Sequence, residues 1–267
     1  MFITTQKIGA LEYLAAEGIS APHCFTTRFG GVSTGALESM NIAIKLDETE
    51  ENVAQNFRIL GDALGFGIDD LVLTRQTHTN WVRAVTRDDC NGCFHRNYPE
   101  CDGLVTNDSG VALTIFTADC TPILLHDPVT GAVGAAHAGW RGTASAIAKV
   151  AVETMVREYG CDPGNIRAAI GPNLDKCCFE TDADVPEAMR AALGAEAEPF
   201  IEVRGAKFHV DLKGINALWL KKAGVRHIEI SEECTMCQPH RFWSHRVTGG
   251  IRGSQGAIIV CKKEANA

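Results

Sequence analysis

The segment from residue 111 to residue 139 is the part of the sequence that most constrains the fold. It reads VALTIFTADCTPILLHDPVTGAVGAAHAG, in which short apolar runs are separated by turn residues. Such runs are typical of strands buried on both faces, and the turn residues between them favour hairpin-like connections. Further β-like runs occupy residues 71–78, 81–86, 103–107, 166–171, 207–212, 227–231 and 256–263.

Four helices are expected from their start and stop signals. They cover residues 50–65, 144–160, 185–194 and 212–224, and each ends at a glycine, which suits a left-handed C-terminal cap. Thr49, Thr143 and Asp211 stand directly before three of these helices as their expected start signals, and Asp184 with Glu187 has capping-box spacing at the other. Because strands outnumber helices, we expect an α+β fold with mixed β-sheets and flanking helices rather than a regular βαβ winding.

The composition is that of an ordinary globular protein. No repeat, low-complexity tract or linker interrupts the sequence, so we expect one domain over residues 1–267. The net charge of -8, without a run of basic residues, argues against a nucleic-acid partner. No basic leader and no long apolar stretch is present, so we expect a cytoplasmic protein without a membrane partner. In that reducing compartment the 11 cysteines are expected to be thiols or metal ligands.

Three candidate metal ligands follow or end predicted strands. They are His78, Cys120 and His137. If these strand ends converge on one rim, a thiolate and two imidazoles form a familiar ligand set for zinc, with a fourth position left for water or substrate. A lone histidine or cysteine at such a place is more often a hydrogen-bonding or buried residue. The small residues around His137, and the nearby polar residues Gln76 and Asp119, favour a site.

A series of motifs carries a resemblance to a known family. In order they are TTRFGGVS (26–33), MNIA (40–43), RQTHTNWV (75–82), CDGLVTN (101–107), TADCTPILLHD (117–127), GAAHAGWRGT (134–143), AAIGPNL (168–174) and HRVTGGIRG (245–253). Together they resemble the YfiH-like family, which was long labelled laccase-domain or multicopper polyphenol oxidase and was later reassigned as purine nucleoside phosphorylases with adenosine deaminase activity.

The resemblance implies a fold, a metal site and a chemistry. It implies the YfiH-like fold and a zinc site on His78, Cys120 and His137, which would also be the catalytic residues. Two departures from the family pattern are Thr79, where the family usually has glycine, and His245, where it usually has tyrosine. Both positions could alter the shape of the pocket without removing a ligand.

Purine nucleoside phosphorolysis requires a phosphate site and contacts to the nucleoside. Arg28 precedes two glycines, which suggests a phosphate cradle, and Arg246 and Arg252 could add a second cationic wall. The expected partners are therefore small purine nucleosides, including methylthioadenosine, and phosphate. Adenosine deamination would use a metal-activated water, with Asp119, Glu180 or a nearby histidine as proton shuttle. The candidate substrate-binding residues are Arg28, Asn41, Gln76, Asp119 and Arg246.

Two other reactions remain open at this point. Cys120 with His137 or His78 could form a nucleophile and base pair in a metal-free amidase or hydrolase that acts on peptidoglycan precursors. A copper-dependent polyphenol oxidase is the other alternative, because one cysteine and two histidines could also bind a single copper. The nine histidines are scattered, without the closely spaced pairs that a multicopper cluster needs. The sequence leaves the oligomeric state open.

The remaining cysteines include three close pairs. CNGC (90–93) and CTMC (234–237) share the spacing of zinc-binding pairs and could complete a second, structural site if they met, although free thiols are the commoner outcome. Cys177 and Cys178 are adjacent, and we expect them near the rim of the pocket, where they would be prone to oxidation.

Overall fold

Two six-stranded sheets form the centre of the molecule. The structure is a computed structural model and describes residues 2–94 and 99–262. The first sheet has the order β1 (Ile3–Ile8), β2 (Leu11–Ala16), β3 (His23–Thr26), β15 (Gln255–Val260), β7 (Ala112–Thr117), β4 (Leu71–Val72). The second has the order β14 (His227–Ile230), β10 (Arg167–Ile170), β8 (Thr121–His126), β9 (Val133–Ala138), β6 (Gly103–Thr106), β5 (Val82–Ala84). Both sheets mix parallel and antiparallel pairs, so the predicted α+β fold with mixed sheets is confirmed.

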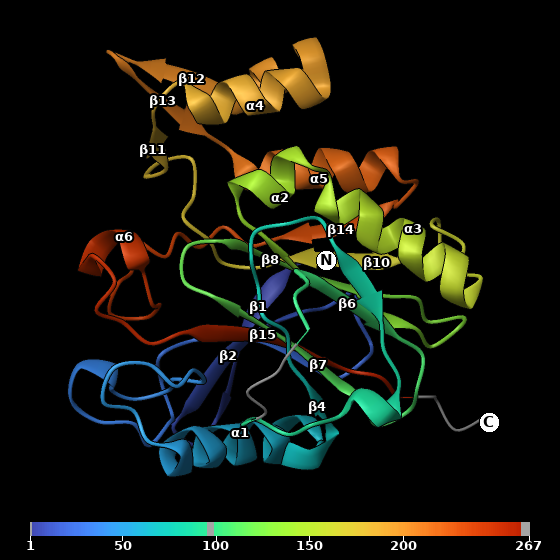
Figure 1. Ribbon diagram of the computed structural model, residues 1–267, viewed down its shortest axis with the longest axis vertical. Helices are drawn as coiled ribbons and strands as arrows, with labels where there is room; N and C mark the ends of the chain where they lie inside the picture. The colour runs from blue at the N-terminus through green and yellow to red at the C-terminus, as the bar shows by residue number, and fades with distance from the viewer. Residues whose placement is uncertain (1, 95–98, 263–267) are drawn as a thin grey trace.

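The two sheets share a buried apolar core. Phe25 and Ile115 of the first sheet belong to the same cluster as Leu124 and Ala135 of the second. The outer face of the first sheet is covered by α1 (Glu50–Leu64), and that of the second by α3 (Ile147–Tyr159) and α5 (Leu212–Lys222). Figure 1 shows these helices on opposite sides of the sheets. Burial of apolar side chains on both faces of each sheet explains why the central strands read as continuous apolar runs.

A smaller unit lies beyond α5, at the top of Figure 1. It contains α4 (Asp184–Leu193) and a sheet of β11 (Glu180–Thr181), β13 (Lys207–Val210) and β12 (Ile201–Arg204). Its core joins Met189 and Val210 to Ile215 of α5. Two short helices, α2 (Trp140–Ala144) and α6 (His245–Thr248), complete the helical elements that matter for the site.

Two of the four predicted helix starts are confirmed, at Thr49 and Asp211, and two are wrong, at Thr143 and Asp184. The side chains of Thr49 and Asp211 accept hydrogen bonds from the backbone N–H groups of Asn52 and Gly214, as N-caps do. Thr143 does not begin α3, because it lies inside α2 and the backbone breaks at the left-handed residue Ala146. Asp184 is already inside the first turn of α4 and caps nothing, although its charge there suits the helix dipole.

The strand predictions missed the N-terminal hairpin and overstated one run. Strand β1 is an edge strand whose residues are half-buried or exposed, so it lacks the apolar run that marks a central strand. The run at 71–78 forms a strand only over Leu71–Val72. Its remaining residues form a loop whose polar groups bind other parts of the chain.

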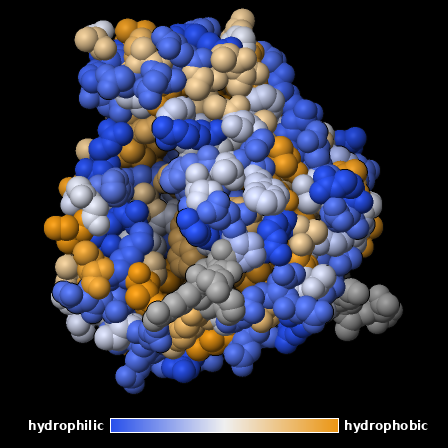
Figure 2. Space-filling model, in the orientation of Figure 1, coloured by the Kyte–Doolittle hydropathy of each residue, from blue (hydrophilic) through white to orange (hydrophobic). Residues whose placement is uncertain are grey.

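Hydrophilic side chains predominate on the face drawn in Figure 2. Within residues 2–94 and 99–262, no helix is both long and apolar enough to cross a membrane.

Candidate metal centre and its cavity

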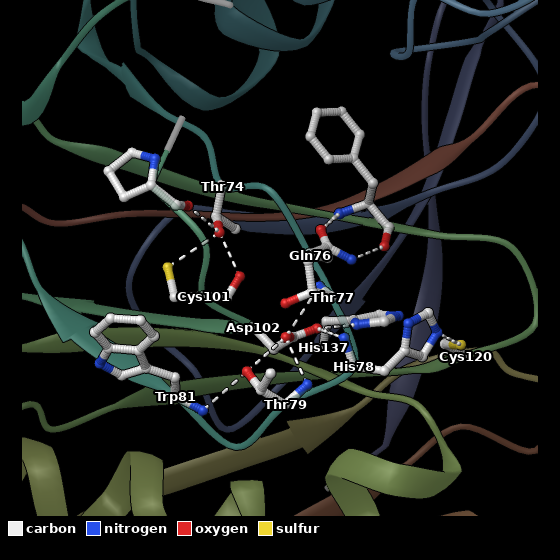
Figure 3. A network of polar contacts seen from close by, with 12 residues as sticks. Thr74, Gln76, Thr77, His78, Thr79, Trp81, Cys101, Asp102, Cys120 and His137 are labelled. Atoms are coloured by element: carbon white, nitrogen blue, oxygen red, sulfur yellow. Dashed lines mark hydrogen bonds and ion pairs between the residues drawn. The ribbon is translucent and has the colours of Figure 1, made fainter. Parts of the chain in front are cut away.

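His78, Cys120 and His137 lie together in the structure, as predicted. Their ligand atoms are all within 4.8 Å of one another, and Cys120 Sγ lies 3.8 Å from His78 Nε2. Cys120 lies in the connection between β7 and β8, and His137 lies in β9 opposite Pro122, so the β8–β9 hairpin brings the two together. Figure 3 shows the loop that follows β4 carrying His78 to the same point.

A glycine leaves the space that this grouping needs. A Cβ atom on Gly139 would lie 2.5 Å from His78 Cδ2 and 3.4 Å from Cys120 Sγ. The first distance is too short for a stable contact, so a larger residue would displace the His78 ring. Glycine at position 139 therefore leaves room for the side chains of His78 and Cys120.

Asp102 holds the histidines in place, and the sequence did not nominate it. Its buried carboxylate accepts five hydrogen bonds, from the backbone N–H groups of Thr77, His78 and Thr79, from Thr79 Oγ1 and from His137 Nδ1. Burial raises the pKa of Asp102, but the hydrogen bonds from His137 and Thr79 outweigh burial and lower it to about 2. Figure 3 shows Asp102 between Thr79 and the two histidines. The available sequence signal was a charged residue directly before an apolar strand.

The electrostatics of the centre favour an ionised Cys120. Burial raises the pKa of the Cys120 thiol, but the charge of His137 and the hydrogen bonds from His137 and His78 outweigh this and lower it. For His137, burial lowers the pKa, and the charges of Cys120 and Asp102 raise it overall. A thiolate is the form in which cysteine binds metals and attacks carbon, so the site is suited to either chemistry.

The three side chains fit a tetrahedral metal ion. With Zn–S bonds of about 2.3 Å and Zn–N bonds of about 2.0 Å, tetrahedral geometry separates sulfur and nitrogen by roughly 3.5 Å. The 3.8 Å between Cys120 Sγ and His78 Nε2 is close to this value. Because His137 Nδ1 is hydrogen-bonded to Asp102, its Nε2 is the nitrogen available to a metal, as in other carboxylate–histidine–metal arrangements.

The candidate centre lies on the wall of a cavity of 790 Å³. That volume is in the range of small-molecule sites. Apolar and aromatic side chains, Phe94 and Phe116 among them, line it together with Gln76, Lys45 and Arg252. Gln76 uses both ends of its amide on the backbone of Phe116, at 2.7 Å each, and so ties the loop of His78 to β7.

Lys45 and Arg252 give this cavity a cationic wall. Lys45 is exposed and Arg252 half-buried. Partial desolvation beside the cavity, and secondarily the charge of Arg252, lower the pKa of Lys45 to about 8, and partial burial lowers the pKa of Arg252. Among the described residues neither side chain forms an ion pair with a carboxylate, and the buried Arg252 Nε has no hydrogen-bond partner there. The sequence suggested Arg252 as a cationic wall but missed Lys45, which follows the MNIA motif in an apolar context.

The structure places Arg28 and Asn41 away from the cavity wall. The Arg28 guanidinium stacks on Trp243 with 3.8 Å to the ring centroid, and its nitrogens donate to the carbonyls of Pro239 and Glu38. The buried Asn41 bonds Glu48 and the backbone of neighbouring loops. Both residues stabilise loops in this structure, and their roles in substrate binding stay predictions.

Asp119 and Arg246 are also absent from that wall. Asp119 accepts hydrogen bonds from Thr235 Oγ1 at 2.6 Å and from the Arg246 backbone N–H at 2.7 Å. The Arg246 side chain lines a second cavity, of 380 Å³, together with Glu180 and Phe179. Of the five candidate substrate-binding residues, the structure therefore brings only Gln76 to the cavity of the metal centre.

Comparisons with known proteins agree with the motifs. The family model described as multi-copper polyphenol oxidoreductase laccase matches residues 22–262. Purine nucleoside phosphorylase YlmD of Geobacillus stearothermophilus is 38% identical over 90% of this chain and 89% of its own. Its crystal structure has a TM-score of 0.91 at 35% identity and covers 98% of this chain and 100% of that chain.

Two further proteins extend the comparison. Adenosine deaminase RL5, from an unknown prokaryotic organism, is 34% identical over 88% of this chain and 92% of its own. The crystal structure of the hypothetical protein YfiH of Bacillus licheniformis has a TM-score of 0.89 at 32% identity and covers 97% of this chain and 99% of that chain. On the family match and these relatives, the chain belongs to the multi-copper polyphenol oxidoreductase laccase family, whose YfiH and YlmD members it resembles in both sequence and fold.

Proposed function

We propose that this protein is a zinc-dependent purine nucleoside phosphorylase. The reaction converts a nucleoside and phosphate into the free base and ribose 1-phosphate. One observation carries the proposal: a cavity of 790 Å³ has the candidate metal centre and the cationic pair Lys45 and Arg252 on its wall. The name of the YlmD relative supports the same reaction.

The three candidate ligands suit a single zinc ion better than a multicopper cluster. When bound by His78, Cys120 and His137, zinc would supply a Lewis acid beside the reacting atoms. A multicopper oxidase needs further imidazole ligands, and the only other metal-competent group among the described residues consists of four cysteines. Single-copper binding at the same three ligands is the alternative that a metal analysis would distinguish.

Lys45 and Arg252 are the residues to which we assign phosphate. Both cations line the cavity, Lys45 exposed and Arg252 half-buried, and neither has a carboxylate partner in the described part of the chain, so both charges are available to an anion in the cavity. Arg28 is less suited, since its guanidinium is occupied by Trp243 and two carbonyls. The glycines after it serve backbone packing: a Cβ on Gly30 would lie 2.2 Å from the Cα of Leu11.

The rest of the wall suits a purine nucleoside. Phe94 and Phe116 offer flat apolar surfaces for the base. In phosphorolysis a phosphate oxygen bonds to C1′ of the ribose, the bond from C1′ to the base breaks, and its electron pair leaves with the base, which takes up a proton. A cationic wall that holds phosphate in line with that bond lowers the barrier by orientation and charge stabilisation.

Adenosine deamination is a second proposed activity. The RL5 relative, which is named an adenosine deaminase, supports it. In this reaction water replaces the amino group on the purine ring and ammonia leaves. Methylthioadenosine is a further substrate that the apolar part of the wall would accept, and we propose it as a phosphorolysis substrate.

A product assay on protein of known metal content tests the function. Adenosine is incubated with and without phosphate, and the expected products are adenine and ribose 1-phosphate only when phosphate is present. Inosine formed without phosphate reports deamination. Zinc-loaded protein that releases no base from any purine nucleoside would overturn the proposal, and amide hydrolysis that survives zinc removal would favour a Cys120 nucleophile instead.

Cys120→Ala and Cys93→Ala form a matched pair for this assay. Both thiols line the cavity, but only Cys120 belongs to the metal-competent group. We expect Cys120→Ala to lose bound zinc and turnover, and Cys93→Ala to keep both. Equal activity in the two variants would remove Cys120 from the mechanism.

A further inference from the structure

Four cysteines outside this cavity form a second cluster. The Sγ atoms of Cys177, Cys178, Cys234 and Cys237 all lie within 4.8 Å of one another. The pair in CTMC therefore meets the adjacent pair Cys177 and Cys178, and not the CNGC pair with which the sequence suggested it could combine. The cluster belongs to loops beside the small upper unit and takes no part in the proposed reaction.

The sheet topology explains why these loops meet. Strands β10 and β14 are parallel neighbours, with Ile170 opposite Ile230, so the loops that follow them leave the same edge of the second sheet. The first loop carries Cys177 and Cys178, and the second carries Cys234 and Cys237. The Thr235 backbone N–H donates to the Asn173 carbonyl at 2.8 Å and joins the two loops next to the cluster.

The sulfur separations match a tetrahedral metal and not a disulfide. Cys177 and Cys178 are 3.6 Å apart, Cys177 and Cys237 3.7 Å, and Cys178 and Cys237 3.4 Å. Four sulfurs at about 2.3 Å from zinc are separated by about 3.8 Å, whereas bonded sulfurs are about 2.05 Å apart. All four cysteines are free in the structure.

The turn around Cys234 is built to hold a thiolate. The backbone of Asp175, Cys237 and Met236 lies within hydrogen-bonding reach of the Cys234 sulfur. Backbone N–H groups aimed at the first sulfur of a Cys-x-x-Cys turn stabilise negative charge on that sulfur. Cys177 and Cys237 are exposed, so a metal ion could enter and leave from solvent.

We propose that Cys177, Cys178, Cys234 and Cys237 form a structural zinc site. Four thiolates around zinc would fasten the loop after β10 to the loop after β14. The second loop carries Thr235, whose hydroxyl donates to Asp119 at 2.6 Å, and Asp119 precedes Cys120 in the chain. The site would therefore support the metal centre of the cavity without contacting its substrate.

The test measures zinc bound per chain in the Cys120→Ala variant, which lacks a ligand of the metal centre in the cavity. Its result therefore does not depend on the proposed function. Protein loaded with zinc under reducing conditions and then desalted should retain about one zinc ion per chain. Adding Cys177→Ser and Cys178→Ser should remove that ion. Adding Cys90→Ser and Cys93→Ser instead, a pair of the same spacing as CTMC, should leave it bound.

Cobalt substitution and alkylation keep the test decisive if a variant fails to fold. Cobalt in the Cys120→Ala protein should give the visible spectrum of a tetrahedral tetrathiolate. In the wild-type protein, zinc should protect Cys177 and Cys237 from alkylation, and a chelator should expose them. Absence of zinc from Cys120→Ala protein, equal alkylation with and without zinc, or a disulfide between Cys178 and Cys237 in the reduced, zinc-loaded protein would each overturn the proposal.

Discussion

Asp102→Asn is the perturbation whose effect the structure defines most closely. Both oxygens of the carboxylate are used: Oδ2 accepts from Thr77, from the Thr79 backbone and from the Thr79 hydroxyl, and Oδ1 accepts from the backbone of His78 and from His137 Nδ1. An asparagine can accept through one oxygen only. If its amino group takes the Oδ1 position, two donors lose their acceptor.

The expected cost follows from those two donors. A buried donor without a partner costs about 1–3 kcal/mol, so the free energy of unfolding of the metal-free protein should fall by about 2–6 kcal/mol. That is a large part of the 5–15 kcal/mol that typically stabilises a domain. Because His137 also loses the carboxylate that selects its metal-binding tautomer, zinc affinity should fall by about 10–100-fold.

Two assays measure these quantities separately. Urea unfolding after chelation gives the stability of the metal-free protein, and competition with a chromogenic chelator gives the zinc affinity of the folded protein. Glu198→Gln is the matched control, since it removes a carboxylate that pairs with Arg190 at the surface, and no measurable change is expected. Asp102→Asn protein with wild-type stability and zinc affinity would refute the assignment of Asp102 as the residue that positions the centre.

Three further perturbations test other parts of the structure. Gly139→Ala should reduce zinc occupancy by about 10-fold or more while the protein stays folded, because its Cβ would lie 2.5 Å from His78 Cδ2; full zinc occupancy by elemental analysis would contradict this. Lys45→Met should raise the KM for phosphate by about 10–100-fold, the value of one charge-assisted hydrogen bond, with zinc retained. Arg28→Gln should leave that KM unchanged, and the opposite pattern in phosphate titrations would assign the anion site to Arg28. Burial lowers the pKa of His126 to about 4, so the folded protein is stabilised above the ordinary histidine pKa of 6.5 and loses that stabilisation as pH falls toward 4. His126→Leu should remove up to about 3 kcal/mol of this acid-induced loss of stability. Parallel curves of unfolding free energy for the two proteins between pH 7 and pH 4 would show the reasoning to be wrong.

The proposed zinc sites differ in what each would contribute. The centre in the cavity has three protein ligands and one open position, which is the arrangement of a catalytic metal. The cysteine cluster offers four ligands and leaves no position for a substrate. Loss of the second ion is therefore expected to weaken the loops around Asp119 and to leave the first set of ligands intact.

What the sequence determined by itself was local in origin. The N-caps at Thr49 and Asp211 depend on bonds within one helical turn. The juxtaposition of Cys120 and His137 depends on one hairpin, whose two apolar runs and turn are contiguous in the chain. These features could be predicted because the residues that create them are close together in sequence.

The tertiary structure decided what depends on distant segments. Asp102 became part of the site because the loop of His78 passes over it, and the four cysteines met because β10 and β14 are parallel neighbours separated by a long connection. The cationic wall likewise joins two residues that are far apart in the chain, Lys45 and Arg252. The Arg28 guanidinium packs on Trp243 instead. The sequence identified most of these residues, but which of them contact one another depends on how the strands pair. Pairing between remote strands is fixed by burial of the whole core and not by neighbouring residues.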